Sequence, residues 1–264
     1  MKKKSHFCSS KKVGIPAAEM KETIDRNNIP KHIAVIMDGN GRWAKQKGAM
    51  RIFGHRNAIQ AVREAIEGSG ELGVNYLTLF SFSTENWSRP KEEVDALMDL
   101  LVQTIVAETG LMMKENVRLN AIGDLESLPK STYDKLIEVM QQTSANTGLT
   151  VNLALSYSGQ WDLTKAAQRI AQKVSEGKLS PGEITQQTLA DHLDTAGIPD
   201  PELMIRTSGE YRISNFLLWQ LAYTELYFSD VLWPDFRKEH LFAAIEDYQK
   251  RERRFGKTGE QVKP

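Results

Sequence analysis

The stretch His32-Ile-Ala-Val-Ile-Met-Asp-Gly-Asn-Gly-Arg-Trp43 decides the fold class of this chain. Its first six residues form an apolar run rich in β-branched side chains, which is typical of a strand buried on both faces. The run stops at Asp38, and Gly39 and Gly41 follow directly, as expected where a strand turns into a loop. The stretch therefore predicts a buried strand over residues 32–37 that ends in a polar, glycine-rich loop.

Beyond this strand, short apolar runs alternate with segments in which apolar residues recur every three or four positions. This alternation predicts an α/β fold with a mainly parallel central sheet flanked by helices. Because there is neither an internal repeat nor a long linker, we expect a single domain over residues 29–256, with a flexible polar lead at 1–28 and a flexible tail at 257–264. Further strands are expected at 74–82, 117–122, 149–155 and 203–206, and helices around 59–66, 94–105, 133–140, 163–174, 183–193 and 241–248.

Composition excludes several classes of protein. The 264 residues carry 34 basic and 34 acidic side chains, a balance that gives nucleic-acid binding no support. The single cysteine, Cys8, excludes an internal disulfide and fits a reducing compartment. The longest apolar runs fall far short of the roughly 18–20 residues that span a bilayer, so we expect a soluble cytoplasmic protein.

The polar residues that follow the strands are the candidate functional residues, because ligands of such sheets bind beyond the carboxyl ends of the strands. Asp38 is a hard oxygen ligand that suits Mg²⁺, and the glycines after it let backbone N–H groups approach a phosphate. On this fragment alone, an ordinary helix cap and turn would explain the residues slightly better. Arg51 and His55 share one helix face, which suits a phosphate group but is also common on a solvated surface.

Two later strand ends carry similar chemistry. The segment 83–90 holds hydroxyls, an amide, an indole and an arginine, and it fits a functional loop and a plain helix start equally well. In the segment 206–215, Arg206 and Arg212 could hold a diphosphate, or could form surface ion pairs with Glu202 and Glu210. Glu225 is a lone acid in apolar sequence, which indicates a functional or dimer-linked role. Together these residues form an inventory that suits a diphosphate and Mg²⁺.

In these motifs and their order, the chain resembles the cis-prenyltransferase family, most closely its bacterial undecaprenyl diphosphate synthase branch. The resemblance runs from about Pro30 to Phe255 with natural spacing, and several long motifs in one order are very specific. The residues that carry it are 32–44, 54–55, 82–90, 206–220, 225–228 and 233–236.

The resemblance implies a single α/β domain with an elongated hydrophobic tunnel, and a homodimer. It implies a Mg²⁺-dependent enzyme that condenses isopentenyl diphosphate repeatedly onto an allylic diphosphate, usually farnesyl diphosphate, with cis double bonds. The implied product is undecaprenyl diphosphate, the C55 carrier of cell-wall sugars. The implied location is the cytoplasm, with transient contact to the inner membrane face through the apolar product.

The resemblance also implies a role for each motif residue. Asp38 corresponds to the essential acid that binds Mg²⁺, and Glu225 to a second Mg²⁺ ligand, in its own site or in that of the partner subunit. Glu93 lies on a mobile segment that closes the tunnel. The allylic substrate is held by Gly39, Asn40, Gly41, Arg42, Trp43, Arg51 and His55, with further substrate contacts from Ser83, Thr84, Glu85, Trp87 and Arg89. Isopentenyl diphosphate is bound by Arg206, Arg212, Ile213 and Ser214.

The family description makes Asn86 the acceptor of the proton that leaves during condensation. Because a neutral amide is a poor base, our hypothesis is that Asn86 orients the reacting groups and that a diphosphate oxygen takes the proton. The chain departs from the family pattern at Ser81 and in the segment 156–160, and both departures bear on the shape of the tunnel. Leu149 is expected at the tunnel floor.

The sequence argues against three other functions. An all-trans prenyl synthase would need aspartate-rich D-D-x-x-D clusters on helices, and this chain has none. A non-catalytic partner subunit would have lost the acid and the arginines, whereas Asp38, Arg206, Arg212 and Glu225 are present. A generic phosphate-binding module would explain the anion donors but neither the acids nor the ordered motifs.

Overall fold

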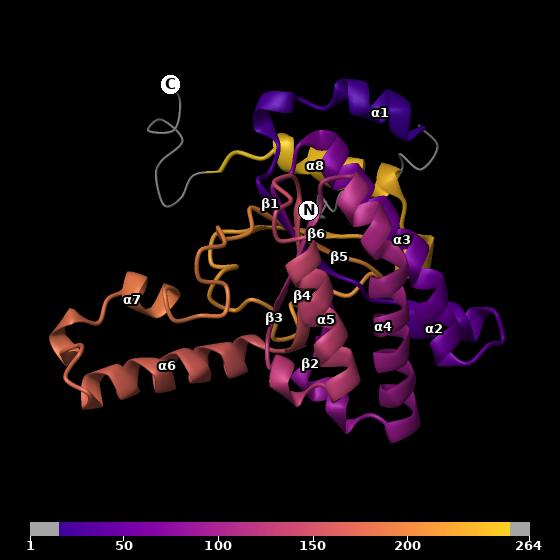
Figure 1. The fold of residues 1–264 in the computed structure, drawn as a ribbon. Helices are drawn as coiled ribbons and strands as arrows, with labels where there is room; N and C mark the ends of the chain where they lie inside the picture. The colour runs from indigo at the N-terminus through magenta and orange to yellow at the C-terminus, as the bar shows by residue number, and fades with distance from the viewer. Residues whose placement is uncertain (1–15, 254–264) are drawn as a thin grey trace, which may run out of the picture.

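Six parallel strands lie at the centre of the structure (Figure 1). The computed structural model describes residues 16–253. All neighbouring strands pair in parallel, in the order β3-β4-β2-β1-β5-β6, which confirms the predicted α/β class. The strands are β1 (His32–Ile36), β2 (Tyr76–Ser83), β3 (Arg118–Ile122), β4 (Thr150–Tyr157), β5 (Leu203–Arg206) and β6 (Glu225–Phe228).

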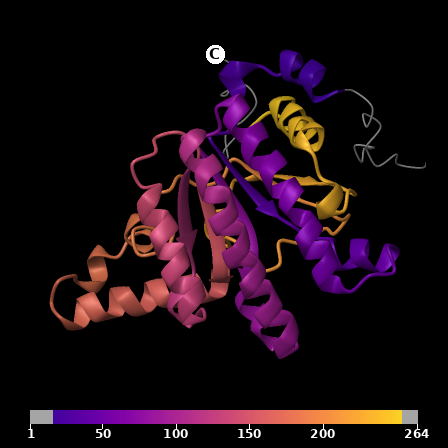
Figure 2. The ribbon, with the colours of Figure 1, turned by 45° about the vertical axis from the view of Figure 1, so that its right-hand side comes forward.

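Helices cover one face of the sheet, where the larger hydrophobic core lies. Figure 2 shows α3, α4 and α5 side by side over this face, while α6 and α7 project from the body as an arm. The helices are α1 (Ala17–Thr23), α2 (Asn40–Gln46), α3 (Arg51–Leu72), α4 (Lys91–Lys114), α5 (Lys130–Gln142), α6 (Gly159–Ser175), α7 (Gln186–Ala190) and α8 (Lys238–Gln249).

The central strand β1 is buried on both faces, as its sequence predicts. Ile33 and Val35 point into the larger core, whereas Ala34 and Ile36 belong to a smaller cluster on the opposite face. That smaller cluster is completed by residues such as Phe216 from the irregular segment 207–224. Successive side chains of a strand point to opposite faces of the sheet. A strand can therefore be apolar throughout only where both faces are covered.

A row of hydrogen-bonded polar side chains crosses four strands inside the sheet. Asn120 on β3 donates to Asn152 on β4 (2.9 Å), and Asn152 donates to Thr78 on β2 (3.1 Å). The Thr78 hydroxyl lies 2.7 Å from Nε2 of His32 on β1, and Nδ1 of His32 lies 2.6 Å from the Pro199 carbonyl oxygen. Burial lowers the pKa of His32 to about 4, although the Pro199 carbonyl and Glu202 act in the opposite direction, so the ring is neutral near pH 7.

Three boundaries differ from the sequence-based expectations. The sequence predicts a flexible lead that includes residues 17–28, but α1 packs against α8, and Met20 of α1 and Ile24 after it are buried in the larger core. The strand β6 was not predicted, because the surrounding sequence is apolar without alternation. The helix expected at 183–193 is shorter, since a 3₁₀ turn at Pro181–Glu183 precedes α7. The rest of the predicted lead and the tail at 257–264 lie outside the described residues.

An apolar cavity of about 790 Å³ lies between the sheet and the helices α3 and α4. Its walls include Ile59 and Val62 of α3, Leu101 and Ile105 of α4, and Leu153 of β4. By length and composition alone, α4 would qualify as a membrane-spanning helix, with a mean hydropathy of 1.4. Many of its apolar side chains, such as Leu97, Leu101 and Ile105, line this cavity, which gives a structural reason for much of its composition.

Candidate active site

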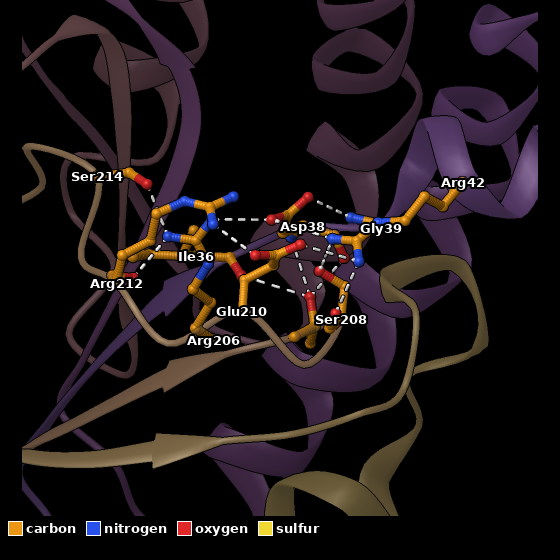
Figure 3. A network of polar contacts seen from close by, with 10 residues as sticks. Ile36, Asp38, Gly39, Arg42, Arg206, Ser208, Glu210, Arg212 and Ser214 are labelled. Atoms are coloured by element: carbon orange, nitrogen blue, oxygen red, sulfur yellow. Dashed lines mark hydrogen bonds and ion pairs between the residues drawn. The ribbon is translucent and has the colours of Figure 1, made fainter.

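Asp38 and Arg206 meet at the carboxyl edge of the sheet because their strands are neighbours. Ile36 of β1 pairs in register with Arg206 of β5, so the residue that follows β1 by two positions faces this arginine. Arg206 Nη2 donates to Asp38 Oδ2 at 2.8 Å, and Arg42 Nη2 lies 3.5 Å from the same oxygen (Figure 3). Thr207, which sequence reasoning missed, ties the two strand ends together, since its hydroxyl donates to the Asp38 carbonyl oxygen (2.6 Å).

The two arginines keep Asp38 ionised. Burial alone would raise the pKa of Asp38, but the hydrogen bond and charge of Arg206, with further help from the Gly39 N–H and from Arg42, lower it below its ordinary value. Arg206 itself is only 3% exposed, and its Nε is buried without a hydrogen-bond partner. A buried, unpartnered N–H beside an ionised carboxylate is a donor prepared for an anionic ligand.

Arg42 is anchored on the turn that follows β5. Its Nη1 donates to the Ser208 carbonyl oxygen (2.9 Å) and its Nη2 to the Ser208 hydroxyl (2.5 Å). Gly39 makes this approach possible, because it has a φ of +110° and an added Cβ would lie 3.0–3.1 Å from Leu232 and Ser208. No L side chain fits there without strain, so the glycine is needed for the close contact.

The segment 206–215 folds around Arg206. Arg206 Nη1 donates to the Arg212 carbonyl oxygen (2.5 Å) and to the Ser214 hydroxyl (2.7 Å). The buried Arg206 therefore fixes the backbone of the exposed Arg212. Arg212 pairs with Glu210, as the alternative interpretation anticipated. Arg206 does not pair with Glu202, which binds Arg253 instead.

Asn215 joins this segment to the loop after β2, a role that sequence reasoning did not assign. Its side-chain nitrogen donates to Glu85 Oε1 (2.7 Å), and its side-chain oxygen accepts from the Gln160 N–H (3.0 Å). Asn215 has a φ of +60°, a left-handed conformation that asparagine tolerates better than most residues. Asn215 directly follows Ser214 within the family motif, and this position could have predicted that Asn215 belongs to the site.

The loop after β2 forms the 3₁₀ turn η2 (Thr84–Ser88) and is fixed to the end of β4. Trp87 Nε1 donates to the Ser156 hydroxyl, and Thr84 donates to the Ser158 hydroxyl, both at 2.9 Å. The two serines belong to the segment in which the chain departs from the family pattern. Ser83 caps η2, because its N–H donates to the Asn86 side-chain oxygen at 3.1 Å.

Four predicted site residues line the polar mouth of the apolar cavity, namely Asn40, His55, Asn86 and Arg89. Burial and the charge of Arg89 lower the pKa of His55 to about 4, so its ring is neutral near pH 7. Asn40 Nδ2 lies 3.3 Å from His55 Nδ1. With Asn40 donating, His55 carries its proton on Nε2 and offers that N–H as a donor.

The remaining motif residues occupy supporting positions. Glu93 is 3.5 Å from Arg51 and 3.2 Å from Arg89, which links α3, η2 and α4. Trp43 stacks on Phe53 with ring centroids 5.8 Å apart. Gly41 lies next to the Arg51 guanidinium, and Ile213 packs against the smaller hydrophobic cluster.

Glu225 does not join the other site residues within one chain. It starts β6, where it pairs in register with Leu203, whereas Arg206 pairs with Phe228 at the carboxyl end. Glu225 therefore lies at the amino end of its strand, where Arg251 Nη1 binds it at 2.9 Å. Within a single chain, Asp38 has no help from Glu225 in binding a metal ion.

The donor set around Asp38 fits Mg²⁺ only in the presence of a phosphate ligand. Among residues 16–253 there is no group of three or more His, Cys, Asp or Glu side chains that could hold a metal ion. Mg²⁺ commonly uses one or two carboxylates, and takes its remaining ligands from substrate phosphates and water. One carboxylate beside two arginines thus suits a metal ion that is bound together with a diphosphate.

Comparison with known proteins identifies the family of this chain. The chain matches the family model described as "Putative undecaprenyl diphosphate synthase" over residues 36–256. It belongs to the cis-prenyltransferase family. This cis-prenyltransferase is 54% identical over 234 residues to an isoprenyl transferase of Porphyromonas gingivalis, covering 89% of this chain and 92% of the relative. It is 53% identical over 233 residues to a farnesyl-diphosphate-specific ditrans,polycis-undecaprenyl-diphosphate synthase of Pasteurella multocida, with 88% and 97% covered.

Solved structures of related proteins share the fold. Lavandulyl diphosphate synthase from Lavandula x intermedia, in complex with dimethylallyl diphosphate, superposes with a TM-score of 0.86 at 36% identity, covering 88% of this cis-prenyltransferase and 100% of that chain. A probable undecaprenyl diphosphate synthase from Campylobacter jejuni gives a TM-score of 0.73 at 37% identity, with 87% and 100% covered.

Proposed function

We propose that the protein elongates farnesyl diphosphate with successive isopentenyl diphosphate units, and that its product is undecaprenyl diphosphate, the lipid carrier for cell-wall sugars. The observation that supports this most directly is that Asp38, held by Arg206 and Arg42, lies in sequence between Met37 and Asn40, which both line the apolar cavity. A diphosphate held by the arginines would direct its prenyl chain into the cavity. The names of the relatives support the same substrates.

The residues of this chain would act mainly by binding and charge stabilisation. During condensation the allylic C–O bond breaks, and its electron pair leaves with the diphosphate. The double bond of isopentenyl diphosphate attacks the allylic carbon, and the resulting cation loses a proton to a diphosphate oxygen, which forms the new double bond. Arg42, Arg206 and the neutral His55 can donate hydrogen bonds to the departing diphosphate, and these strengthen as negative charge develops. Mg²⁺ bound at Asp38 would add Lewis-acid stabilisation of the same leaving group.

Asn86 has its side-chain oxygen engaged with the Ser83 N–H, which supports an orienting role for it. We expect both Asn86→Ala and Asn86→Asp to lower kcat about 10- to 100-fold, because misplacement of reacting groups has costs of that size. Steady-state kinetics of the two variants test this. Full activity of Asn86→Asp together with an inactive Asn86→Ala would instead make residue 86 the base.

Leu149 lies just before β4 and lines the far end of the cavity, as expected from the sequence. Leu149→Ala should give longer products, because removal of the side chain deepens the cavity. The same change should cost about 2–5 kcal/mol of stability, as is usual when a buried leucine is truncated. Separation of labelled products by length checks the expectation, and an unchanged distribution would refute it.

A homodimer and a cytoplasmic location, with transient contact to the inner membrane face, complete the proposal. Glu225 lies on the edge strand β6 and does not reach the metal site of its own chain. In a dimer, it could instead act as a ligand in the metal site of the partner subunit. Sedimentation analysis of the purified protein tests the dimer. The alternative, a non-catalytic partner subunit, is not favoured, because the Asp38–Arg206 pair is complete.

The deciding experiment combines the purified protein with Mg²⁺, farnesyl diphosphate and labelled isopentenyl diphosphate, with and without a chelator. We expect a Mg²⁺-dependent ladder of products that ends near C55. A ladder with another end point would keep the chemistry and revise the product. No product from a folded dimer would favour the partner-subunit alternative.

A further inference from the structure

Two ion pairs join α3 and α4 along the line where these helices meet, here called the α3–α4 seam. Near the cavity mouth, Arg51 Nε lies 3.5 Å from Glu93 Oε1. Deeper along the seam, Arg63 of α3 holds Glu108 of α4 in a forked arrangement. Its Nε lies 3.0 Å from both carboxylate oxygens, and its Nη2 lies 2.5 Å from Oε1. Arg63 and Glu108 both line the apolar cavity.

The deeper pair lies in the cavity wall between the apolar lining and solvent. The Glu108 side chain is 12% exposed and the Arg63 side chain 44%, so the carboxylate lies inward and the guanidinium caps it from outside. Val62, Ile66 and Ile105 in the same cavity wall are apolar, whereas Glu67, one turn along α3 from Arg63, is a second acid. Two helices share no backbone hydrogen bonds, so side chains alone keep such a seam closed. Parting this pair would leave a carboxylate uncompensated in an apolar wall.

A growing prenyl chain inside the cavity would press against the α3–α4 seam. If the diphosphate end binds beside Asp38 and Arg206 before each condensation, the apolar end lies five carbons deeper each time. Leu149 and Val117 lie at the far end of the cavity. The wall at this end also includes Glu71 and Glu115, near the ends of α3 and α4. A chain that has reached these residues can advance by displacing them or by parting α3 from α4. Hydrocarbon cannot solvate the separated charges as water can, so a filled cavity makes the seam harder to open.

We propose that Arg63 and Glu108 act as a latch that sets the length at which the product stops growing, by keeping the α3–α4 seam closed to the end of the chain. The inference rests on the chain elongation proposed above. The two residues are positioning residues, because they act through the helices and lie away from the diphosphate site. They would therefore control product length rather than the rate of the first condensation.

The test compares product ladders of the full-length protein under one set of conditions. We expect Arg63→Ala and Glu108→Ala each to extend the main product by at least one five-carbon unit. The charge exchange Arg63→Glu with Glu108→Arg should restore the original end point. A matched control is Arg169→Ala, because the Arg169–Asp194 pair has a similar distance (2.9 Å) and similar side-chain exposures (46% and 13%) but lies on the α6 arm. This control should leave the ladder unchanged.

Each outcome decides between the interpretations. The latch is wrong if both single variants are folded by circular dichroism and give the original ladder. It is also wrong if the charge exchange keeps the longer products, because side-chain volume rather than pairing would then set the length. The first addition of isopentenyl diphosphate should proceed at the original rate in all variants. Absence of any ladder from the unmodified protein would overturn the elongation function together with the latch.

Discussion

Asp38→Ala should abolish chain elongation, with kcat/KM falling by about 1,000-fold or more. A loss of this size corresponds to about 4 kcal/mol of transition-state stabilisation, which is within the range of a lost metal ligand and charge-stabilising group. Asp38 is the carboxylate that Arg206 and Arg42 hold next to the cavity-lining Met37, and these arginines keep it ionised at neutral pH. The measurement is steady-state condensation of labelled isopentenyl diphosphate at saturating Mg²⁺.

Asp38→Asn is the matched control for shape. The amide keeps the size of the side chain but loses the charge that faces Arg206 and the metal ion, so its activity should fall nearly as far. Activity of Asp38→Asn within about tenfold of the original would contradict a role as metal ligand, since a loss of one ligand has larger effects. Thermal unfolding of both variants separates a loss of chemistry from a loss of fold.

The second large effect is on stability in acid, through His32 in the polar row that crosses the sheet. The folded-state pKa of His32 is lowered to about 4 by burial, from an ordinary value of 6.5. Between these pH values the unfolded chain binds the proton and the folded protein does not. Stability is therefore complete above pH 6.5 and falls as the pH drops toward 4, by about 3 kcal/mol from this residue.

Denaturant unfolding at pH 7 and at pH 4.5 measures this effect. His32→Gln cannot take up the proton, so its stability should change less between the two pH values than that of the original protein. Other groups, including His55 with its similarly lowered pKa, contribute equally to both proteins and cancel in the comparison. Equal pH dependence in the two proteins would show that His32 is not the titrating group.

The sequence predicted the parts of the fold that depend on local pattern. The apolar run at 32–37 gave β1 and the glycine-rich loop after it, because a strand buried on both faces has a clear signature. It could not give β6 or α1, whose places in the fold depend on partners far away in sequence. Met20 and Ile24 of the α1 segment are two apolar residues in a polar stretch, and only their docking on α8 buries them.

The sequence predicted which residues form the candidate site, but it did not predict which of them are in contact. Motif order supplied Asp38 and Arg206, but their contact follows from the pairing of β1 with β5, which no local pattern encodes. Periodicity could not distinguish core from cavity wall on α4, since a helix looks the same when it faces packed side chains or a tunnel. The placement of Glu225 at the amino end of β6 likewise required the register of the sheet.

The strand order also determines when during synthesis the protein can become active. The strands β1 to β4 can pair with one another as soon as they leave the ribosome, but the outer edge of β1 then stays open until β5 arrives. An open apolar edge is a template for pairing with other chains, so the nascent protein is exposed to aggregation during this interval. Arg206, 168 residues after Asp38, ends the strand that covers this edge. The pairing of β5 with β1 thus covers the open edge of the nascent protein and at the same time assembles its diphosphate site.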